Sequence, residues 1–174
     1  MAKQPTAKVS VTALGQVRIF SPLTEEELTV LAENCSWSRH EAASEVLAQN
    51  APCDEVYFIC SGRVSAKTFS DAGKEITFAE LVQGDVFGEL SALDGQPRSS
   101  FVVTLEESLL AALPAHIFNE FLDSHPKVMR ALMVELTGRL RRADEKVFEF
   151  STLNTSNRIH AELLRLASMH PAQD

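Results

Sequence analysis

The chain has 174 residues, of which 45% are hydrophobic and 23% charged, so it can form a packed domain with an appendage and is not a disordered polymer. A formal net charge of −8 argues against a protein that grips nucleic acid by itself, because DNA and RNA attract basic surfaces. Three cysteines without a Cys-x-x-Cys spacing and five scattered histidines argue against a zinc or iron–sulfur site and favour a reducing, cytoplasmic location without a metal cofactor.

Membrane insertion and catalysis are not expected either. No run approaches the ~18 apolar residues that a membrane span needs, and the first residues lack the apolar stretch of a signal peptide. The sequence has no Gly-x-Ser-x-Gly elbow and no Walker loop, which are motifs of serine hydrolases and of nucleoside triphosphatases. We therefore expect a protein that is not an enzyme and has no membrane partner.

Residues 1–14 are expected to form a flexible tail, and the first helix follows them. Thr24 precedes three consecutive glutamates, Glu25 to Glu27, and then an apolar run. A threonine followed three residues later by a glutamate is typical of a capping box, and acidic side chains favour the positive end of a helix dipole. The helix is predicted to end near Asn34.

Short apolar runs separated by turn residues fill the segment 35–113. Residues 56–60 are followed by Ser61-Gly62, and residues 64–69 are followed by the turn 71–73. Turn signals roughly every eight to twelve residues are typical of an antiparallel β-sandwich or β-roll.

Residues 87–100, hereafter the cassette, have the pattern of a phosphate and sugar site: Phe-Gly-Glu-Leu-Ser-Ala-Leu-Asp-Gly-Gln-Pro-Arg-Ser-Ser. Gly88 lets the main chain approach a ligand closely, and residues 89–93 can form a short helix whose free N–H groups suit an anion. Arg98 supplies a forked, permanently charged donor for the phosphate. Glu89 would repel a phosphate, so we expect its carboxylate to accept a hydrogen bond from a sugar hydroxyl.

The cassette resembles the phosphate-binding segment of cyclic-nucleotide-binding domains. The resemblance rests on Gly88-Glu89-Leu90, on the nine-residue step from Glu89 to Arg98 within Pro97-Arg98-Ser99-Ser100, and on the preceding Gly84-Asp85. It implies that Glu89 holds the ribose 2′-hydroxyl and Arg98 the cyclic phosphate. It also implies that backbone N–H or hydroxyl groups line the phosphate at Gly88, Leu90, Ser99 and Ser100. The alternative is that Glu89 and Arg98 form an ordinary surface ion pair.

The same resemblance implies an α+β fold for the chain. Residues 15–124 would form an antiparallel β-roll of jelly-roll type with flanking helices. One of these helices is predicted over residues 114–122, where apolar side chains gather on one side.

A longer helix is predicted over residues 125–150, because a proline at position 126 suits its first turn. Its apolar residues recur at alternating steps of four and three: Met129, Met133, Leu136, Leu140, Ala143, Val147 and Phe150. This spacing, hereafter the seam, is typical of a coiled coil, so we expect a homodimer through residues 129–150. The alternative is a helix that packs only on its own β-roll.

Poor helix formers at 151–154 interrupt this pattern, and an amphipathic helix is predicted for residues 155–169. Asn157-Arg158-Ile159 and the run 162–167 resemble the first helix of the DNA-binding domain in catabolite-activator-type (Crp/Fnr) regulators. The resemblance implies that residues 151–174 are a hinge and the start of a DNA-binding domain absent from this chain, through which alone DNA would be contacted. We expect a truncated piece of such a regulator, and a stand-alone sensor is the alternative.

The favoured function is therefore the ligand-sensing and dimerisation domain of a bacterial transcription regulator. The bound nucleotide would favour one arrangement of the dimer helices and so control DNA binding allosterically. The alternative is a cyclic-nucleotide-binding module that regulates another protein without touching DNA.

The identity of the base depends on Ala143 and Asp144, which we include among the ligand-binding candidates. Catabolite-activator-type regulators have a threonine and a serine at these two positions. Asp144 accepts hydrogen bonds only, and guanine offers two adjacent donors whereas adenine offers a single amino group; Ser99 could add a contact to guanine. The alternative is that Asp144 pairs with Arg139 across the coiled coil. Cyclic AMP is the favoured ligand, as the commoner one in such regulators, and cyclic GMP is the next candidate.

Overall fold

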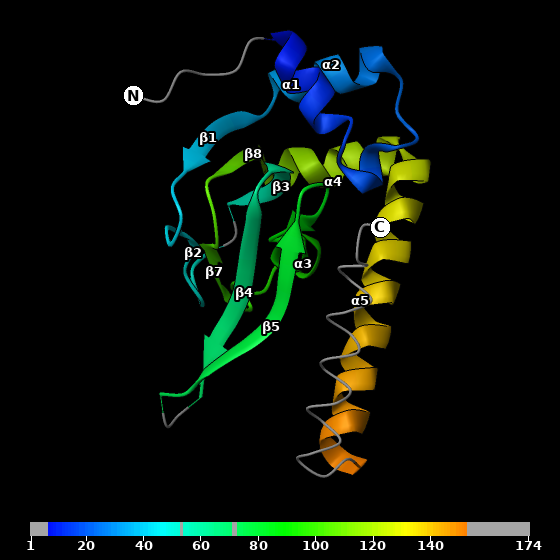
Figure 1. Cartoon of the computed structure of the whole chain (residues 1–174). Helices are drawn as coiled ribbons and strands as arrows, with labels where there is room; N and C mark the ends of the chain where they lie inside the picture. The colour runs from blue at the N-terminus through cyan, green and yellow to red at the C-terminus, as the bar shows by residue number, and fades with distance from the viewer. Residues whose placement is uncertain (1–6, 53, 71–72, 153–174) are drawn as a thin grey trace, which may run out of the picture. The chain divides into compact units, whose positions relative to one another are not determined.

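A computed structural model describes residues 7–52, 54–70 and 73–152 of the chain (Figure 1). The chain divides into two units, residues 1–131 and 132–174. The predicted helix 155–169, with Asn157-Arg158-Ile159, lies outside the described residues. Within them, no helix combines the length and the apolar character that crossing a membrane requires.

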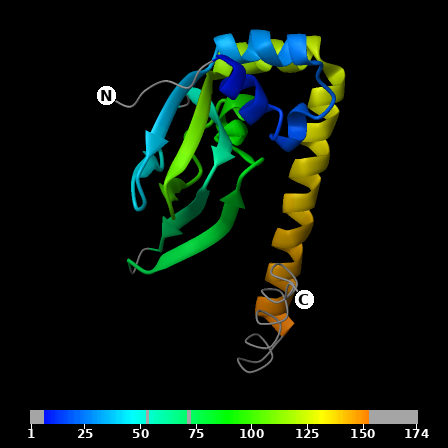
Figure 2. The same ribbon diagram turned by 45° about the horizontal axis from the view of Figure 1, so that its top comes forward.

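The amino-terminal part of the first unit is helical. It contains α1 (Ala7–Leu14), the short 3-10 helix η1 (Arg18–Phe20) and α2 (Glu25–Glu33), and α1 and α2 lie together at one end of the strands (Figures 1 and 2). The expectation of a flexible tail over residues 1–14 missed α1, whose last residue, Leu14, is fully buried. The capping box of Thr24 and Glu27 is confirmed, as is a helix end near Asn34, which is the C-cap residue of α2.

Two antiparallel four-stranded sheets form the centre of the first unit. One sheet has the order β1-β8-β3-β6 and the other β2-β7-β4-β5. The strands are β1 (Ser36–His40), β2 (Glu45–Leu47), β3 (Glu55–Ser61), β4 (Arg63–Phe69), β5 (Glu75–Val82), β6 (Val86–Phe87), β7 (Phe101–Thr104) and β8 (Ser108–Pro114). The predicted antiparallel β-roll is therefore confirmed.

Alternation along β3 gives the roll two apolar layers. Ile59 belongs to a buried cluster with residues of both sheets: Leu47, Val64, Leu81, Phe87, Val102 and Leu110. Phe58, on the opposite face of β3, packs its ring 4.8 Å from that of Phe20 and 6.2 Å from that of Phe118. Because successive side chains of a strand point to opposite faces, β3 joins the inter-sheet core to the layer of helices.

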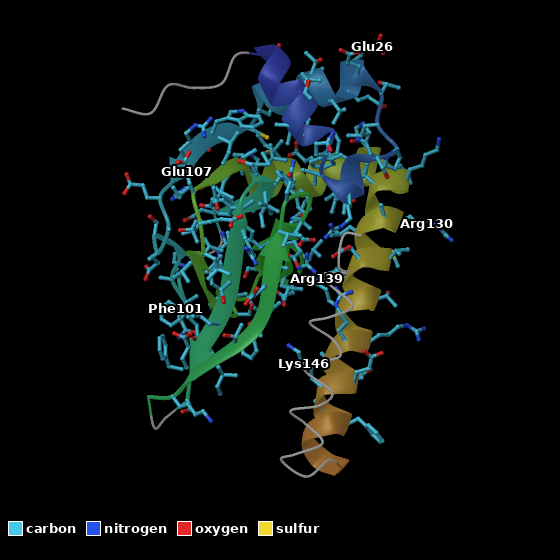
Figure 3. The ribbon with its side chains drawn as sticks, in the orientation of Figure 1. Glu26, Phe101, Glu107, Arg130, Arg139 and Lys146 are labelled. Carbon is cyan, nitrogen blue, oxygen red and sulfur yellow. The ribbon has the colours of Figure 1, made fainter. Side chains whose placement is uncertain are left out.

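Three further helices complete the described chain. These are α3 (Glu89–Asp94), α4 (Ala115–Ser124) and α5 (Pro126–Thr152). The restart of the chain as a helix at Pro126 is confirmed, and α5 continues two residues past the expected end at 150. In the second unit, the seam residues Met133, Leu140 and Val147 have 61%, 62% and 65% of their surface exposed. Figure 3 shows Arg139 and Lys146 on one side of this helix.

The contribution of the capping box to stability can be tested by substitution. The Glu27 N–H donates to Thr24 Oγ1 at 3.3 Å, and the Thr24 N–H donates to the Glu27 carboxylate at 2.7 Å. We expect Thr24→Ala to lower the free energy of unfolding by about 0.5–2 kcal/mol, because it removes the acceptor of an otherwise unpaired helix N–H. Urea unfolding of the full chain measures this, with Thr24→Ser as the control that keeps the oxygen. Equal stability of the two variants would contradict the expectation.

Candidate functional site

The cassette connects β6 to β7, and its central helix α3 begins after a glycine in the left-handed conformation. Gly88, the N-cap residue of α3, has φ +80°, which lies in the left-handed region that favours glycine. A Cβ atom there would lie 2.7 Å from Arg98 Nη1 and 3.2 Å from the Glu55 carbonyl oxygen. Sequence analysis expected Gly88 to make room for a ligand. The structure shows that the group brought close to this glycine is the guanidinium of Arg98.

Arg98 is buried, with 4% of its surface exposed, and backbone carbonyls hold its side chain. Nη1 donates to the Gly88 oxygen at 2.8 Å, and Nη2 donates to the Glu55 oxygen at 2.6 Å. Within the described residues, the buried Nε–H has no hydrogen-bond partner. These carbonyls orient the guanidinium without neutralising its charge, since each is an uncharged acceptor.

Glu89, the predicted sugar-binding acid, is also buried, with 2% of its surface exposed. It is the first residue of α3, which packs against β3 and α4. Neither Glu89 nor Arg98 is at the surface, so the alternative of an exposed ion pair between them is wrong. The helix that carries Glu89 is anchored by Asn119 of α4, whose side-chain amide donates to the Ala92 carbonyl oxygen at 2.8 Å.

A second loop holds the backbone on which Arg98 and Ser99 lie. The Asn50 N–H donates to the Arg98 carbonyl oxygen at 3.0 Å, and the Arg98 N–H donates to the Ala51 oxygen at 3.0 Å. The Gln49 side-chain amide donates to the Ser99 oxygen at 3.3 Å. Sequence analysis missed this loop entirely. The only local signal is Asn50, which adopts φ +64° and belongs to a residue type that tolerates such a conformation.

Tyr57 fixes the side chain of Glu55, the residue whose carbonyl oxygen accepts from Arg98. The Tyr57 ring stacks on Phe87, with centroids 5.1 Å apart and planes 8° apart. The Tyr57 hydroxyl donates to the Glu55 carboxylate at 2.8 Å, so Glu55 is held at its side chain while its backbone oxygen accepts from Arg98. Burial, and then the hydrogen bond to Glu55, raise the pKa of Tyr57, which keeps this hydroxyl protonated.

Gly84 and Asp85, which precede the cassette, have a structural role. Asp85 is buried, accepts from the Val82 N–H at 2.8 Å and pairs with Arg18. A Cβ at Gly84 would lie 2.9 Å from the Gln16 carbonyl oxygen. These two residues therefore fasten the turn between β5 and β6 to the amino-terminal segment.

The other predicted site residues are spread over both units. Leu90 and Ser99 are exposed and Ser100 is half-buried, all within the cassette. Ala143 and Asp144 lie on α5 in the second unit, where both are exposed. Arg139, considered as a partner of Asp144, pairs with Glu135 of the same helix at 3.3 Å. Among the described residues, no three His, Cys, Asp or Glu side chains gather as a metal site would require.

The site combines a buried cationic donor, Arg98, with a buried acidic residue, Glu89. A buried guanidinium keeps an unpartnered N–H, and a buried carboxylate begins the adjacent helix. Such an arrangement suits a ligand that combines a negative group with a hydroxyl, because the anion supplies the Arg98 Nε–H with an acceptor and a carboxylate can accept from the hydroxyl.

Curated relatives cover most of this chain. It is 28% identical to the cAMP-activated global transcriptional regulator CRP of Escherichia coli, over 87% of this chain and 72% of that protein. It is 25% identical to the CRP-like cAMP-activated global transcriptional regulator of Mycobacterium tuberculosis, over 92% of this chain and 72% of that protein.

Solved structures share the fold. The catabolite activator protein of Thermus thermophilus is 28% identical, with a TM-score of 0.68 over 77% of this chain and 63% of that one. The c-di-GMP responsive regulator CLP of Xanthomonas campestris is 20% identical, with a TM-score of 0.74 over 82% of this chain and 72% of that one. Residues 38–125 match the family described as cyclic nucleotide-binding domain. With its β-roll and its cassette, the chain belongs to the cyclic nucleotide-binding domain family, in the form found in CRP-type regulators.

Proposed function

We propose that this chain is the cyclic-nucleotide-sensing and dimerisation region of a bacterial transcription regulator, with cyclic AMP as the favoured ligand. The observation that carries the proposal is the buried Arg98, whose Nε–H is unpartnered and whose side chain is held by uncharged carbonyls. A buried charge held by neutral acceptors, with one N–H left unsatisfied among the described residues, is costly, so such a site is poised to receive an anion. A cyclic phosphate carries a single negative charge and suits a forked donor.

The remaining parts of the nucleotide follow from the neighbours of Arg98. The Glu89 carboxylate accepts a hydrogen bond from the ribose 2′-hydroxyl. It faces the sugar because a carboxylate would repel the phosphate. Gly88, Leu90, Ser99 and Ser100 present backbone N–H or hydroxyl groups to the phosphate. In this arrangement Glu89 binds the neutral sugar and Arg98 binds the anionic phosphate.

Relatives support cyclic AMP over other nucleotides. The two curated relatives, at 28% and 25% identity, are named as cAMP-activated. The fold by itself does not select the ligand. A structural neighbour at 20% identity is named for its response to c-di-GMP. Another, at 22% identity with a TM-score of 0.69, is the regulatory subunit of a cAMP-independent protein kinase A from Trypanosoma brucei.

Control of DNA binding would start from the helices next to the cassette. Asn119 of α4 holds α3 through the Ala92 carbonyl, and α4 leads through His125 directly into α5. A nucleotide that binds one placement of α3 more tightly than another therefore favours one placement of α4 and of the helix that follows it. The alternative, a module without DNA, uses the same chain of contacts to regulate another protein.

Dimerisation through residues 129–150 is supported by the exposed seam. A helix that leaves Met133, Leu140 and Val147 more than half exposed exposes apolar surface that a second copy of the helix would cover. A parallel pair of such helices would bring two sensing units under common control.

The phosphate role of Arg98 is tested by substitution. We expect Arg98→Ala to weaken cyclic AMP binding by about 2–5 kcal/mol, because it removes a buried charge partner of the phosphate. Isothermal titration calorimetry on the full chain measures the loss, with circular dichroism to confirm folding. Gln96→Ala, a neutral change at an exposed cassette position, is the control. Wild-type affinity in Arg98→Ala would overturn the assignment of the site.

The dimer is tested at the seam. Replacing both Leu136 and Leu140 with glutamate should convert the protein to a monomer, because charges at seam positions cannot be compensated inside a coiled coil. Sedimentation velocity measures the mass. Val134→Glu, at a residue that is 65% exposed and lies outside the seam, should remain dimeric. A wild-type chain that sediments as a monomer at roughly tens of micromolar would contradict the proposal.

Asp144 decides between the two bases. If its carboxylate accepts from guanine, Asp144→Ala should weaken cyclic GMP binding about three- to tenfold and leave cyclic AMP binding unchanged. Calorimetric titrations of wild type and variant with both nucleotides measure the difference, and Glu145→Ala is the matched control on the same helix. Equal effects on both nucleotides would exclude a base-reading role.

A further inference from the structure

The carbonyls of Arg98 and Ser99 point toward the same neighbour, the loop of residues 48–51. The Asn50 N–H donates to the Arg98 oxygen at 3.0 Å, and the Gln49 side-chain amide donates to the Ser99 oxygen at 3.3 Å. In a planar trans peptide, the carbonyl and the following N–H point in opposite directions. The N–H groups of Ser99 and Ser100 are therefore both directed away from this loop. Two successive N–H groups aimed to one side form the kind of concavity that binds anions.

Gln49 holds the Ser99 carbonyl through its side chain, and both ends of its amide are occupied. While Nε2 donates to the Ser99 oxygen, Oε1 accepts from Thr68 Oγ1 at 2.9 Å. An amide whose donor and acceptor both have fixed partners cannot rotate without losing one of them. Thr68 therefore sets the orientation of Gln49, and Gln49 sets the direction of the Ser99 carbonyl.

Thr68 belongs to the β4–β5 hairpin, so these hydrogen bonds connect the cassette to that hairpin. The next residue, Phe69, packs its ring edge-on against Phe101, with centroids 5.6 Å apart. Figure 3 shows Phe101 toward the end of the β-roll away from Glu26 and the amino-terminal helices. The hairpin is thus linked to the chain around Ser99 and Ser100 in two ways, through Gln49 and through the Phe69 and Phe101 rings.

We propose that Gln49 is a positioning residue for the anion site. Held by Thr68, it fixes the Ser99–Ser100 peptide so that the Ser100 N–H is aimed at the phosphate that Arg98 binds. The inference rests on the proposed function, because it assigns a geometric role within that same site. Gln49 itself does not touch the ligand in this account; it acts through the peptide whose carbonyl it holds.

A double-mutant cycle on the full chain tests the inference, with cyclic AMP as the probe. We expect Gln49→Ala to weaken binding roughly three- to tenfold, the cost of one lost hydrogen bond. Thr68→Val should weaken it less, and the double variant should bind no worse than Gln49→Ala, because Thr68 acts through Gln49. Gln83→Ala, at an exposed glutamine in the β5–β6 turn, is the control and should bind as wild type does.

A second readout separates positioning from general destabilisation. Saturating cyclic AMP should shift the Ser100 amide resonance in the ¹⁵N–¹H spectrum of the wild type and of Gln83→Ala, and shift it less in Gln49→Ala. Where Gln49→Ala fails to fold, Thr68→Val carries the same expectation with Gln49 in place.

Three outcomes would overturn the inference. If the wild type binds and Gln49→Ala binds equally well, positioning by Gln49 is wrong while the proposed function stands. The same holds if the losses of Gln49→Ala and Thr68→Val simply add. If the wild type binds no cyclic AMP, the proposed function fails and the inference fails with it.

Discussion

The guanidinium of Arg98, held between the carbonyl oxygens of Gly88 and Glu55, is the constraint around which the site is built. It explains why position 88 is a glycine, since a Cβ there would lie 2.7 Å from Nη1. It also explains why the Glu55 side chain is fixed by Tyr57, because Glu55 supplies one of the two oxygens. A charged group buried on neutral acceptors is stable only while the surrounding backbone holds those acceptors in place.

The β-roll supplies that backbone from parts of the chain that are far apart in sequence. Glu55 begins β3, Gly88 follows β6, and Arg98 precedes β7. The register of β3 with β6, where Tyr57 opposes Phe87, places the Glu55 and Gly88 carbonyls on the same guanidinium. The loop 48–51 then grips the other side of the cassette through backbone hydrogen bonds. The geometry of the site therefore depends on the antiparallel pairing of the strands.

Features that depend on neighbours in sequence could be predicted. The capping box needs only Thr24 and Glu27, and the position of α3 follows from a glycine before a run of good helix formers. The cassette itself could be found because its residue types and spacing are a local pattern. The restart of the chain at Pro126 has the same local origin.

Features that depend on tertiary packing could not be predicted. The helix α1 was missed because its stability comes from packing next to α2, with its last residue Leu14 fully buried, and its own sequence shows no clear apolar stripe. The carbonyl partners of Arg98, on Gly88 and Glu55, could not be predicted because they come from separate parts of the chain. The hydrogen bond from Gln49 to Ser99 joins residues 50 positions apart. Nothing in the sequence around Gln49 indicates such a contact.

The most direct test of this account is the nuclear magnetic resonance signal of the Arg98 Nε–H group in ¹⁵N-labelled protein. This N–H is buried and has no partner among the described residues, so a phosphate oxygen is expected to become its acceptor. The account predicts that cyclic AMP shifts this resonance downfield and slows its exchange with water. A resonance that keeps its position and exchange rate at saturating cyclic AMP would contradict the assignment of Arg98 as the anion-binding group.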